Sequence, residues 1–422
     1  MRVFSLTFLS RQFGAWAVIA LGAVTARVLG RESRGAIESL VVLRLGLHAV
    51  ACLGLPTAAT YAVARRPELA SRVASTALGL GLRAGVASAL LLAGFALLAP
   101  HVFAPISTLG VLAFALSAPA IVTTQNLAGV LLGAGRSSAW NALTFVNRGI
   151  LVAGLGLLFV PALAHVETVV VVLVVAELSA AFVALKAVAT LGPLSTRVDG
   201  EVLASLRGYG VRAWGQGILS FALVRVDVLL LAAIAGTRES GLYAAAGLAR
   251  EMVLFLPWIA GMLLLPKEAA ATGPTGPVTG LLALLPRGLS RRGWAITLGA
   301  ALLLGGFAEP FVTAIHGARF ADGAPLVRIL VVAAVLVGAG NLEIQELLGR
   351  GASGWAAAAP AAALAVSLAG NVVLIPPYGA LGTAWTALGS GAVLFAVTTA
   401  GVIRVRRRRS EPPARAATRP EA

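Results

Sequence analysis

The chain has 422 residues, of which 59% are hydrophobic and only 12% are charged. An ordinary soluble domain carries about 25% charged residues, so this composition excludes a soluble globular protein and places the chain in a bilayer. The net charge of +16 would suggest a nucleic-acid partner for a soluble domain, but basic residues of membrane proteins gather in cytoplasmic loops, and we expect no nucleic-acid binding.

Breaks at charged residues, glycine and proline divide the chain into apolar segments that are long enough to cross a bilayer, which takes about 20 residues. The first segment has no small-residue cleavage site and is expected to remain as an uncleaved span. The ninth is interrupted by Glu309-Pro310. The twelve predicted spans are 11–30, 36–64, 71–99, 104–132, 138–160, 165–190, 206–235, 240–265, 290–315, 323–349, 352–375 and 379–403.

The distribution of lysine and arginine predicts the orientation of these spans. With the N-terminus inside, the outer loops contain only Arg31, Arg34, Arg238 and Arg319, and the inner segments contain most of the other basic residues. Cytoplasmic loops carry such an excess, and an even number of spans returns the C-terminus to the same side. We therefore expect a multi-pass protein of a bacterial-type plasma (inner) membrane with both termini in the cytoplasm.

Two short motifs indicate an internal repeat. GRESRG at 30–35 and GTRESG at 236–241 align with an offset that also places Arg44 on Arg250. A second block follows, in which Asn126-Leu127 aligns with Asn341-Leu342 and Trp140 with Trp355. The alternative is chance convergence of small loops, which the second block disfavours. The pattern predicts two parallel repeats of six helices, a plan that transporters use.

The repeat predicts the domain organisation. We expect an N-terminal six-helix half at 1–195 and a C-terminal six-helix half at 206–403, with a cytoplasmic linker at 266–292. Residues 404–422 are basic, polar and rich in proline, which predicts a disordered cytoplasmic tail. Its arginines would lie near anionic lipid headgroups.

Motifs for catalysis are missing from the sequence. Neither lysine, Lys186 or Lys267, follows a Gly-x-x-x-x-Gly, so there is no phosphate-binding loop. The outer loops are short, no Asp-x-Asp pair occurs, and the single cysteine, Cys52, cannot form an internal disulfide. The four histidines lack metal-ligand spacing. We expect no enzyme activity, no cofactor and no metal.

Several stretches resemble one family of exporters. VRVDVLLLAAIAGTRESGLYAAAGLAREMVLFLP, TARVLGRESRGAIESL, FAEPFVTAIHGARFADGAPLVRIL and NVVLIPPYGALGTAWTALGS are similar, in this order, to regions of the oligosaccharide flippases (O-antigen and teichoic-acid exporters) of the multidrug/oligosaccharidyl-lipid/polysaccharide (MOP) exporter superfamily. The resemblance covers nearly the whole chain. It implies a V-shaped pair of six-helix bundles with alternating access, and a polyprenyl-diphosphate-linked sugar as cargo.

Four arginines lie deep within predicted spans: Arg44, Arg148, Arg225 and Arg250. Each costs about 2.5–3.5 kcal/mol at a helix centre. One interpretation is a cationic cavity between the halves, because an arginine fork binds phosphate and stays charged. The other is ion pairing with acids on other helices. Both remain open for these residues.

Intramembrane acids are the candidates for ion coupling, since the chain has no ATPase motif. Asp227, Glu251 and Glu343 are predicted proton or sodium sites, with structural salt bridges as the alternative. Glu346 and Arg350 have the i, i+4 spacing of a surface-type pair near the inner end.

Three functions are consistent with these features. The first is a flippase for a lipid-linked oligosaccharide, whose partners would be membrane lipids and glycan-assembly enzymes. The second is an ion-coupled small-molecule or drug exporter of the same superfamily; its cationic cargo would favour an acidic or aromatic cavity, and aromatics are only 6% of the chain. The third is an inactive scaffold for glycan-assembly enzymes, which the deep arginines disfavour.

Overall fold

The computed structural model describes residues 2–270, 291–350 and 352–410, and within these ranges the chain is helical with no strand. Most of the predicted linker and the end of the predicted tail, 271–290 and 411–422, lie outside the described residues. The chain divides into two compact units. The first contains the chain up to Ala245 together with Glu309–Gly323 and Asn371–Thr383; the second contains Ala246–Ala308, Ala324–Gly370 and the chain from Ala384.

The first unit begins with α1 (Arg2–Gly46), whose helical path is interrupted at Gly30. A π-helical turn, η1 (Leu47–Ala51), leads to the next helices. These helices are α2 (Leu55–Arg65), α3 (Ala70–Leu98), α4 (Thr108–Leu116), α5 (Ala118–Gly133), α6 (Ser137–Leu155), α7 (Val166–Ala189) and α8 (Gly200–Ala235). Short 3-10 turns are η2 (Pro67–Leu69), η3 (Pro100–Phe103), η4 (Gly156–Phe159) and η5 (Pro161–Leu163).

The remaining helices are divided between the two units, and some of them contain residues of both. They are α9 (Thr237–Ala270), α10 (Arg291–Gly306), α11 (Ala308–His316), η7 (Ala318–Gly323), α12 (Ala324–Gly349) and α13 (Ser353–Ser410). Helix α13 covers the last two predicted spans and is kinked at Gly379. Helices α10 and α11 meet at an angle of 79°, so the predicted interruption of the ninth span is present, with its break at Phe307.

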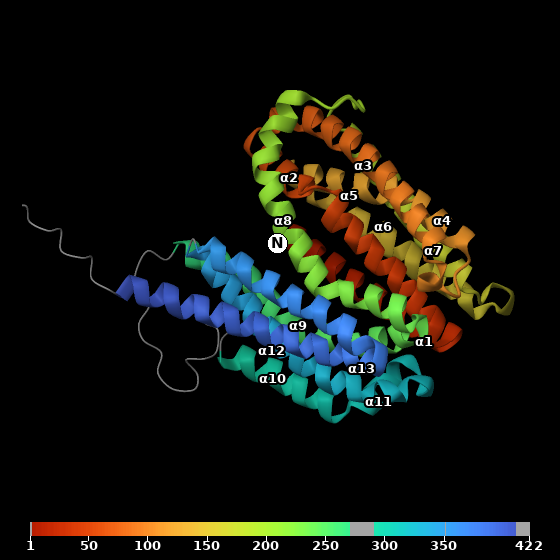
Figure 1. Cartoon of the computed structure of the whole chain (residues 1–422). Coiled ribbons are helices and arrows are strands. Elements are labelled where there is room, and N and C mark those ends of the chain that lie inside the picture. The colour runs from red at the N-terminus through yellow and green to blue at the C-terminus, as the bar shows by residue number, and fades with distance from the viewer. Residues whose placement is uncertain (1, 271–290, 351, 411–422) are drawn as a thin grey trace, which may run out of the picture. The chain divides into compact units, whose positions relative to one another are not determined.

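The core of the first unit is a layer of neighbouring helices. Helix α3 packs against α5, α5 against α7, and α7 against α6, as Figure 1 shows. Glycines allow close approach: a Cβ on Gly85 would lie 2.3 Å from Pro119 Cα. The Gly81-x-x-x-Gly85 motif therefore serves helix packing. Phe103, Phe114 and Ile121 are among the fully buried side chains of this core.

The described part of the second unit has its own smaller core. Helix α10 packs against α12. Trp294 from α10 and Leu342 from α12 are buried there, and Ala260 and Phe395 pack against them. This core places α12 beside the last part of α13, which is the location of the buried acids described below.

The lengths of the helices suit a membrane protein. Seven helical stretches among the described residues are long and apolar enough to cross a bilayer, and the bent pair α10 and α11 would make an eighth. Two of the seven, Leu9–Ala51 and Gly354–Arg406, have 43 and 53 residues, whereas one crossing needs about 20. Each contains a kink glycine at the boundary between two predicted spans, so each is long enough for two crossings.

Candidate functional site

The repeated motifs have matching turn geometry. Gly30 and Gly236 have φ angles of 86° and 87°, a left-handed region that glycine enters without steric cost. A new helical segment starts after each, one at Arg31 and the other at Thr237. The two glycines occupy equivalent places in the predicted repeats, so the shared backbone conformation supports the alignment.

The two motifs also contact each other, and the contact is reciprocal. A Cβ on Gly35 would lie 1.9 Å from the carbonyl oxygen of Thr237, and a Cβ on Gly241 would lie 2.0 Å from that of Arg31. Under the offset of the repeat, Arg31 aligns with Thr237 and Gly35 with Gly241. The same contact is therefore made twice, as an approximate two-fold axis between two copies requires.

The second repeated block ends its helices in the same manner. After α5, the Arg136 amide donates to the Leu131 carbonyl at 2.9 Å; after α12, the Ala352 amide donates to the Leu347 carbonyl at 2.8 Å. Both bonds span five residues, as in a Schellman turn. The halves thus share local structure at two separate positions.

Arg44 is paired with an acid on a distant helix. Its Nε donates to Glu177 Oε1, and Asn147 Nδ2 donates to the same oxygen at 3.0 Å. The side chains of Arg44 and Glu177 are only 11% and 4% exposed. They join α1 to α7, and Asn147 adds α6, so the pairing alternative is present for Arg44.

Arg148 adds a second cation beside this pair. Its charge interacts with those of Arg44 and Glu177, and the residue is half-buried. Among the described residues, no carboxylate lies within ion-pair distance of Arg148. Two arginines therefore lie near the one carboxylate of Glu177, and only Arg44 is paired with it. The group formed by Arg44, Arg148, Glu177 and Asn147, which we call the central cluster, has an excess of positive charge.

Arg225 lies on α8 near another shared acid. Its Nη1 is 3.6 Å from Glu38 Oε1, while Arg34 Nη1 is 2.6 Å from Glu38 Oε2. Asp227, two residues further, accepts a 2.5 Å hydrogen bond from the Tyr243 hydroxyl and one of 2.9 Å from the Val228 amide. The structure therefore places Arg225 and Asp227 in separate polar contacts within the first unit.

The second unit contains the other predicted site residues. Arg250 on α9 is 8% exposed, and Glu251 is half-buried. Glu343 on α12 accepts hydrogen bonds from the hydroxyls of Thr398, at 2.5 Å, and Thr399, at 3.0 Å. The structure brings Glu343 together with two hydroxyl groups of α13, a neighbourhood that the sequence did not reveal.

Glu346 differs from expectation. It does pair with Arg350, at 2.9 Å, but its side chain is 1% exposed and that of Arg350 is 8% exposed. Both nitrogens of the Arg406 fork also reach it, at 3.0 and 2.8 Å. The expected surface-type pair is thus a buried pair joined by a partly exposed third residue, Arg406, because α13 covers α12 at this position.

The sequence alone did not identify Glu177 as the partner of Arg44. The arginines of the outer loops were interpreted only as evidence for orientation. The signal for Glu177 was its occurrence in the otherwise apolar run VVVVLVVAELSAAFVAL, since a lone carboxylate in a span needs a partner.

Comparison with known proteins gives a fold but no sequence family. No protein-family model matches the chain, and no curated protein matches it. Solved structures are similar to it over nearly its whole length. An inward-facing MATE-family multidrug resistance transporter of the MOP superfamily has a TM-score of 0.70 at 16% identity, covering 94% of this chain and 96% of that chain.

Two other structures extend the comparison. The lipid II flippase MurJ, in an inward closed conformation, has a TM-score of 0.71 at 12% identity, covering 96% of this chain and 89% of that one. A MOP-superfamily transporter from Pyrococcus furiosus has a TM-score of 0.53 at 14% identity, covering 96% and 92%. The predicted fold class, an all-helical polytopic membrane protein of about twelve helices with the fold of these transporters, is confirmed.

Proposed function

We propose that the protein is a flippase that moves a polyprenyl-diphosphate-linked oligosaccharide from the inner to the outer leaflet during cell-surface polysaccharide synthesis. The observation that carries the proposal is the central cluster, in which Glu177 pairs with Arg44 and the second cation, Arg148, has no ion-pair partner among the described residues. Excess positive charge inside a membrane-spanning bundle calls for an anion, because an uncompensated arginine there is costly. A diphosphate headgroup supplies that anion.

The chemistry of the arginines suits such a cargo. A guanidinium stays charged at every physiological pH and binds phosphate oxygens through two parallel hydrogen bonds. Arg250 and Arg225 would extend the cationic path, and the two halves, 1–195 and 206–403, would expose it to each side in turn. One of the similar structures is named a lipid II flippase, so the fold accommodates that type of transport.

Ion coupling is the second part of the proposal. Without an ATPase motif, directional movement needs a gradient, and we assign proton or sodium coupling to Asp227, Glu251 and Glu343. Glu343 is the most developed of these, since its carboxylate lies against the hydroxyls of Thr398 and Thr399, and oxygen ligands of this kind suit hard cations. Membrane lipids and glycan-assembly enzymes would be the partners. Both termini would lie in the cytoplasm, as the distribution of basic residues predicts.

An ion-coupled exporter of small molecules is the second candidate, because several similar structures are MATE multidrug transporters. The charge of the binding region distinguishes the exporter from the flippase. For the Pyrococcus furiosus transporter, a reverse polarity of the binding pocket suggests a different function. Arginine excess at the central cluster disfavours organic cations and favours an anionic cargo.

The test is reconstitution in liposomes with a fluorescent polyprenyl-diphosphate oligosaccharide, following its movement between leaflets. Three proteins would be compared: wild type, Arg148→Gln, and Arg44→Gln/Glu177→Gln. The double variant removes the Arg44–Glu177 ion pair as a unit and leaves no unpaired carboxylate, so it separates a substrate role of Arg44 from a purely structural one.

We expect wild type to move the lipid, and both variants to lose most of that movement while remaining folded. Arg66→Gln, an exposed arginine outside the cluster, is the matched control and should behave as wild type. Full transport by the double variant would reject the substrate role of Arg44. Efflux of organic cations by wild type, without lipid movement, would favour the exporter instead.

A further inference from the structure

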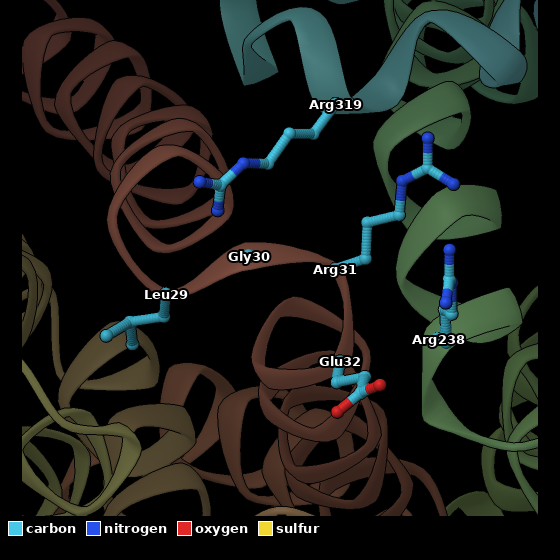
Figure 2. Close-up of a pocket in the computed structure, with 6 residues that line it drawn as sticks. All are labelled: Leu29, Gly30, Arg31, Glu32, Arg238 and Arg319. Carbon is cyan, nitrogen blue, oxygen red and sulfur yellow. The ribbon is translucent and has the colours of Figure 1, made fainter.

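A pocket at the turn between the two parts of α1 is lined by three arginines from three separate segments. Its volume is about 380 Å³, and its lining residues are Leu29, Gly30, Arg31, Glu32, Arg238 and Arg319. In Figure 2, Arg319 extends from η7 toward the Gly30 turn, while Arg31 extends toward the helix that carries Arg238. All six residues belong to the first unit, and none belongs to the central cluster.

The acids near this pocket do not neutralise it. Arg31 is bonded to Asp322 at 2.8 Å, but Asp322 is 74% exposed, so the pair is weak and open to competition. Figure 2 shows the Glu32 carboxylate directed away from Arg31 and Arg319. Within the described part of the chain, Arg238 and Arg319 have no carboxylate partner. The nearest atom to a Cβ on Gly30 would be Arg319 Nη1, at 4.0 Å.

Backbone charge at the pocket has the same sign as the arginines. A helical segment begins at Arg31 and another at Thr237, next to Arg238. The start of a helix has unpaired amide groups and a partial positive charge, which disfavours cations and favours anions. Glu239, in the first turn of α9, is occupied by the Ala380 amide at 2.9 Å. The positive charges of Arg31 and Arg238 therefore lie beside the positive ends of two helices, which is unfavourable unless an anion binds there.

The arginines of the predicted outer loops also indicate an anion-binding pocket. In the predicted topology those loops contain only four arginines, and three of them line this one pocket. The fourth, Arg34, is bonded to Glu38 at 2.6 Å. Outer loops are normally poor in arginine, so this concentration is specific to the pocket and is unlike a charged surface spread over the loops.

From this geometry we propose that Arg31, Arg238 and Arg319 form a binding site for a phosphate or diphosphate group, separate from the central cluster. Guanidinium forks from three separate segments, two of which are helix starts, match the several oxygens of such a group. The volume lies within the range of about 300–1,000 Å³ of small-ligand sites. The group arrives either on a lipid headgroup or as a free anion.

The test is binding by the purified full-length protein, without any transport step. Inorganic pyrophosphate would be titrated calorimetrically, and short-chain phosphatidic acid would be scored as a bound adduct by native mass spectrometry. The variants are Arg319→Gln, Arg238→Gln and the double variant; Arg66→Gln, an exposed arginine outside both proposed sites, is the control. Both pocket arginines are exposed, so thermal unfolding should match wild type and exclude loss of fold.

We expect each single variant to bind pyrophosphate about tenfold more weakly, the value of one charge-assisted hydrogen bond, and Arg66→Gln to bind as wild type. Phosphatidic acid lost from the same variants would identify a lipid headgroup as a ligand; pyrophosphate binding without lipid adducts would identify a free anion. No binding of either probe by wild type, or binding unchanged in the double variant, would overturn the site. Because transport is not measured, this result is independent of the flippase proposal.

Discussion

Arg44 and Glu177 illustrate what one buried ion pair requires of its partners. Glu177 accepts from both Arg44 and Asn147 and its side chain is 4% exposed. Removing one partner leaves a buried charge without compensation, whereas removing both leaves two neutral groups. Stability and transport should therefore respond differently to the same pair of substitutions.

We predict that Arg44→Gln alone lowers the free energy of unfolding by about 3 kcal/mol, the cost of breaking a buried pair. Adding Glu177→Gln should recover most of that loss, because the unpaired carboxylate is then neutral. The measurement is thermal unfolding in detergent. Arg66→Gln should leave the transition unchanged. If Arg44→Gln alone is as stable as wild type, the pair is solvated in solution and the assignment of a buried cluster is wrong.

The sequence predicted which arginines are deep but not what they meet. A charged residue in the middle of an apolar run can be recognised by its position alone, which identified Arg44 and Arg148. Its partner cannot, because Arg44 and Glu177 are 133 positions apart and only the packing of α1 against α6 and α7 brings them together. The arginine pocket was missed for the same reason: Arg31, Arg238 and Arg319 come from three separate segments.

At the scale of elements, the contact between the repeated turns leaves no room for side chains. Gly35 and Gly241 each face a backbone carbonyl of the other motif. A carbonyl cannot rotate away as a flexible side chain can, so an added methyl group must separate the two segments. Gly35 and Gly241 should be equally intolerant of an added methyl group, since they make the same contact.

We predict that Gly35→Ala and Gly241→Ala each destabilise the protein by about 1–3 kcal/mol, as overpacking does. The control is Gly149→Ala on α6, where a Cβ would meet no atom within 4 Å. That substitution should stabilise by about 0.5–1 kcal/mol, because alanine is the better helix former. Thermal unfolding of the three variants gives the comparison. Equal stability of Gly35→Ala and Gly149→Ala would contradict the close contact.

Helix α8 begins at a capping aspartate. Asp199 accepts from the Glu201 and Val202 amides at 3.0 and 3.2 Å, and Arg72 Nη2 lies 2.6 Å from it. The hydrogen bond from the Val202 amide, followed by that from Arg72, lowers the pKa of Asp199 below its ordinary value. The ionised cap therefore stabilises the helix start at neutral pH.

The sign of the pH dependence follows from that lowered pKa. A group whose pKa is lower in the folded protein contributes stability above its unfolded pKa, about 3.9 for aspartate, and loses it as the pH falls through the folded value. We predict lower protection factors for the Glu201 and Val202 amides, which correct the exchange rate for its intrinsic pH dependence, on acidification and in Asp199→Ala at neutral pH. Asp199→Asn retains the cap without the charge and should remove the acid dependence. Acid-insensitive protection factors in wild type would reject this role.

Most helices followed from the sequence, and so did the break in the ninth span, but the break in the fourth span did not. The fourth predicted span, 104–132, is divided into α4 and α5 at Ser117. Pro119 lies in the first turn of α5, where its missing amide costs nothing, so an apolar run can hide a helix start. At Gly30 and Gly379, by contrast, two predicted spans are joined into one long kinked helix, α1 or α13. Apolar length alone does not distinguish these cases.

At the scale of the whole chain, repetition and charge asymmetry remain the arguments for orientation. Twelve spans in two copies of six return the chain to its starting side, and the basic residues then fall mostly on one side. The central cluster lies within the helices, while the arginine pocket lies at a turn that this topology places outside. Both proposed anion sites thus depend on the same assignment of sides, which can be measured directly.

Single-cysteine labelling in intact cells tests that assignment. Cys52 is 2% exposed and would be replaced by serine to give a cysteine-free background. We predict that Arg319→Cys, at the predicted outer loop, reacts with a membrane-impermeant maleimide added outside. Arg66→Cys, at a predicted inner loop, should react only after the membrane is permeabilised. Both side chains are exposed, so a difference in labelling reports the side of the membrane and not burial.

The reverse pattern would place the arginine pocket in the cytoplasm and contradict the positive-inside rule for this chain. In that case the pocket would meet a lipid-linked substrate before its translocation, and the proposed direction of transport would require the opposite order of sites. Labelling of both positions from outside would show that the number of spans between them is even. The predicted pattern, by contrast, requires an odd number of crossings between Arg66 and Arg319, as the assignment of spans 71–99 through 290–315 gives.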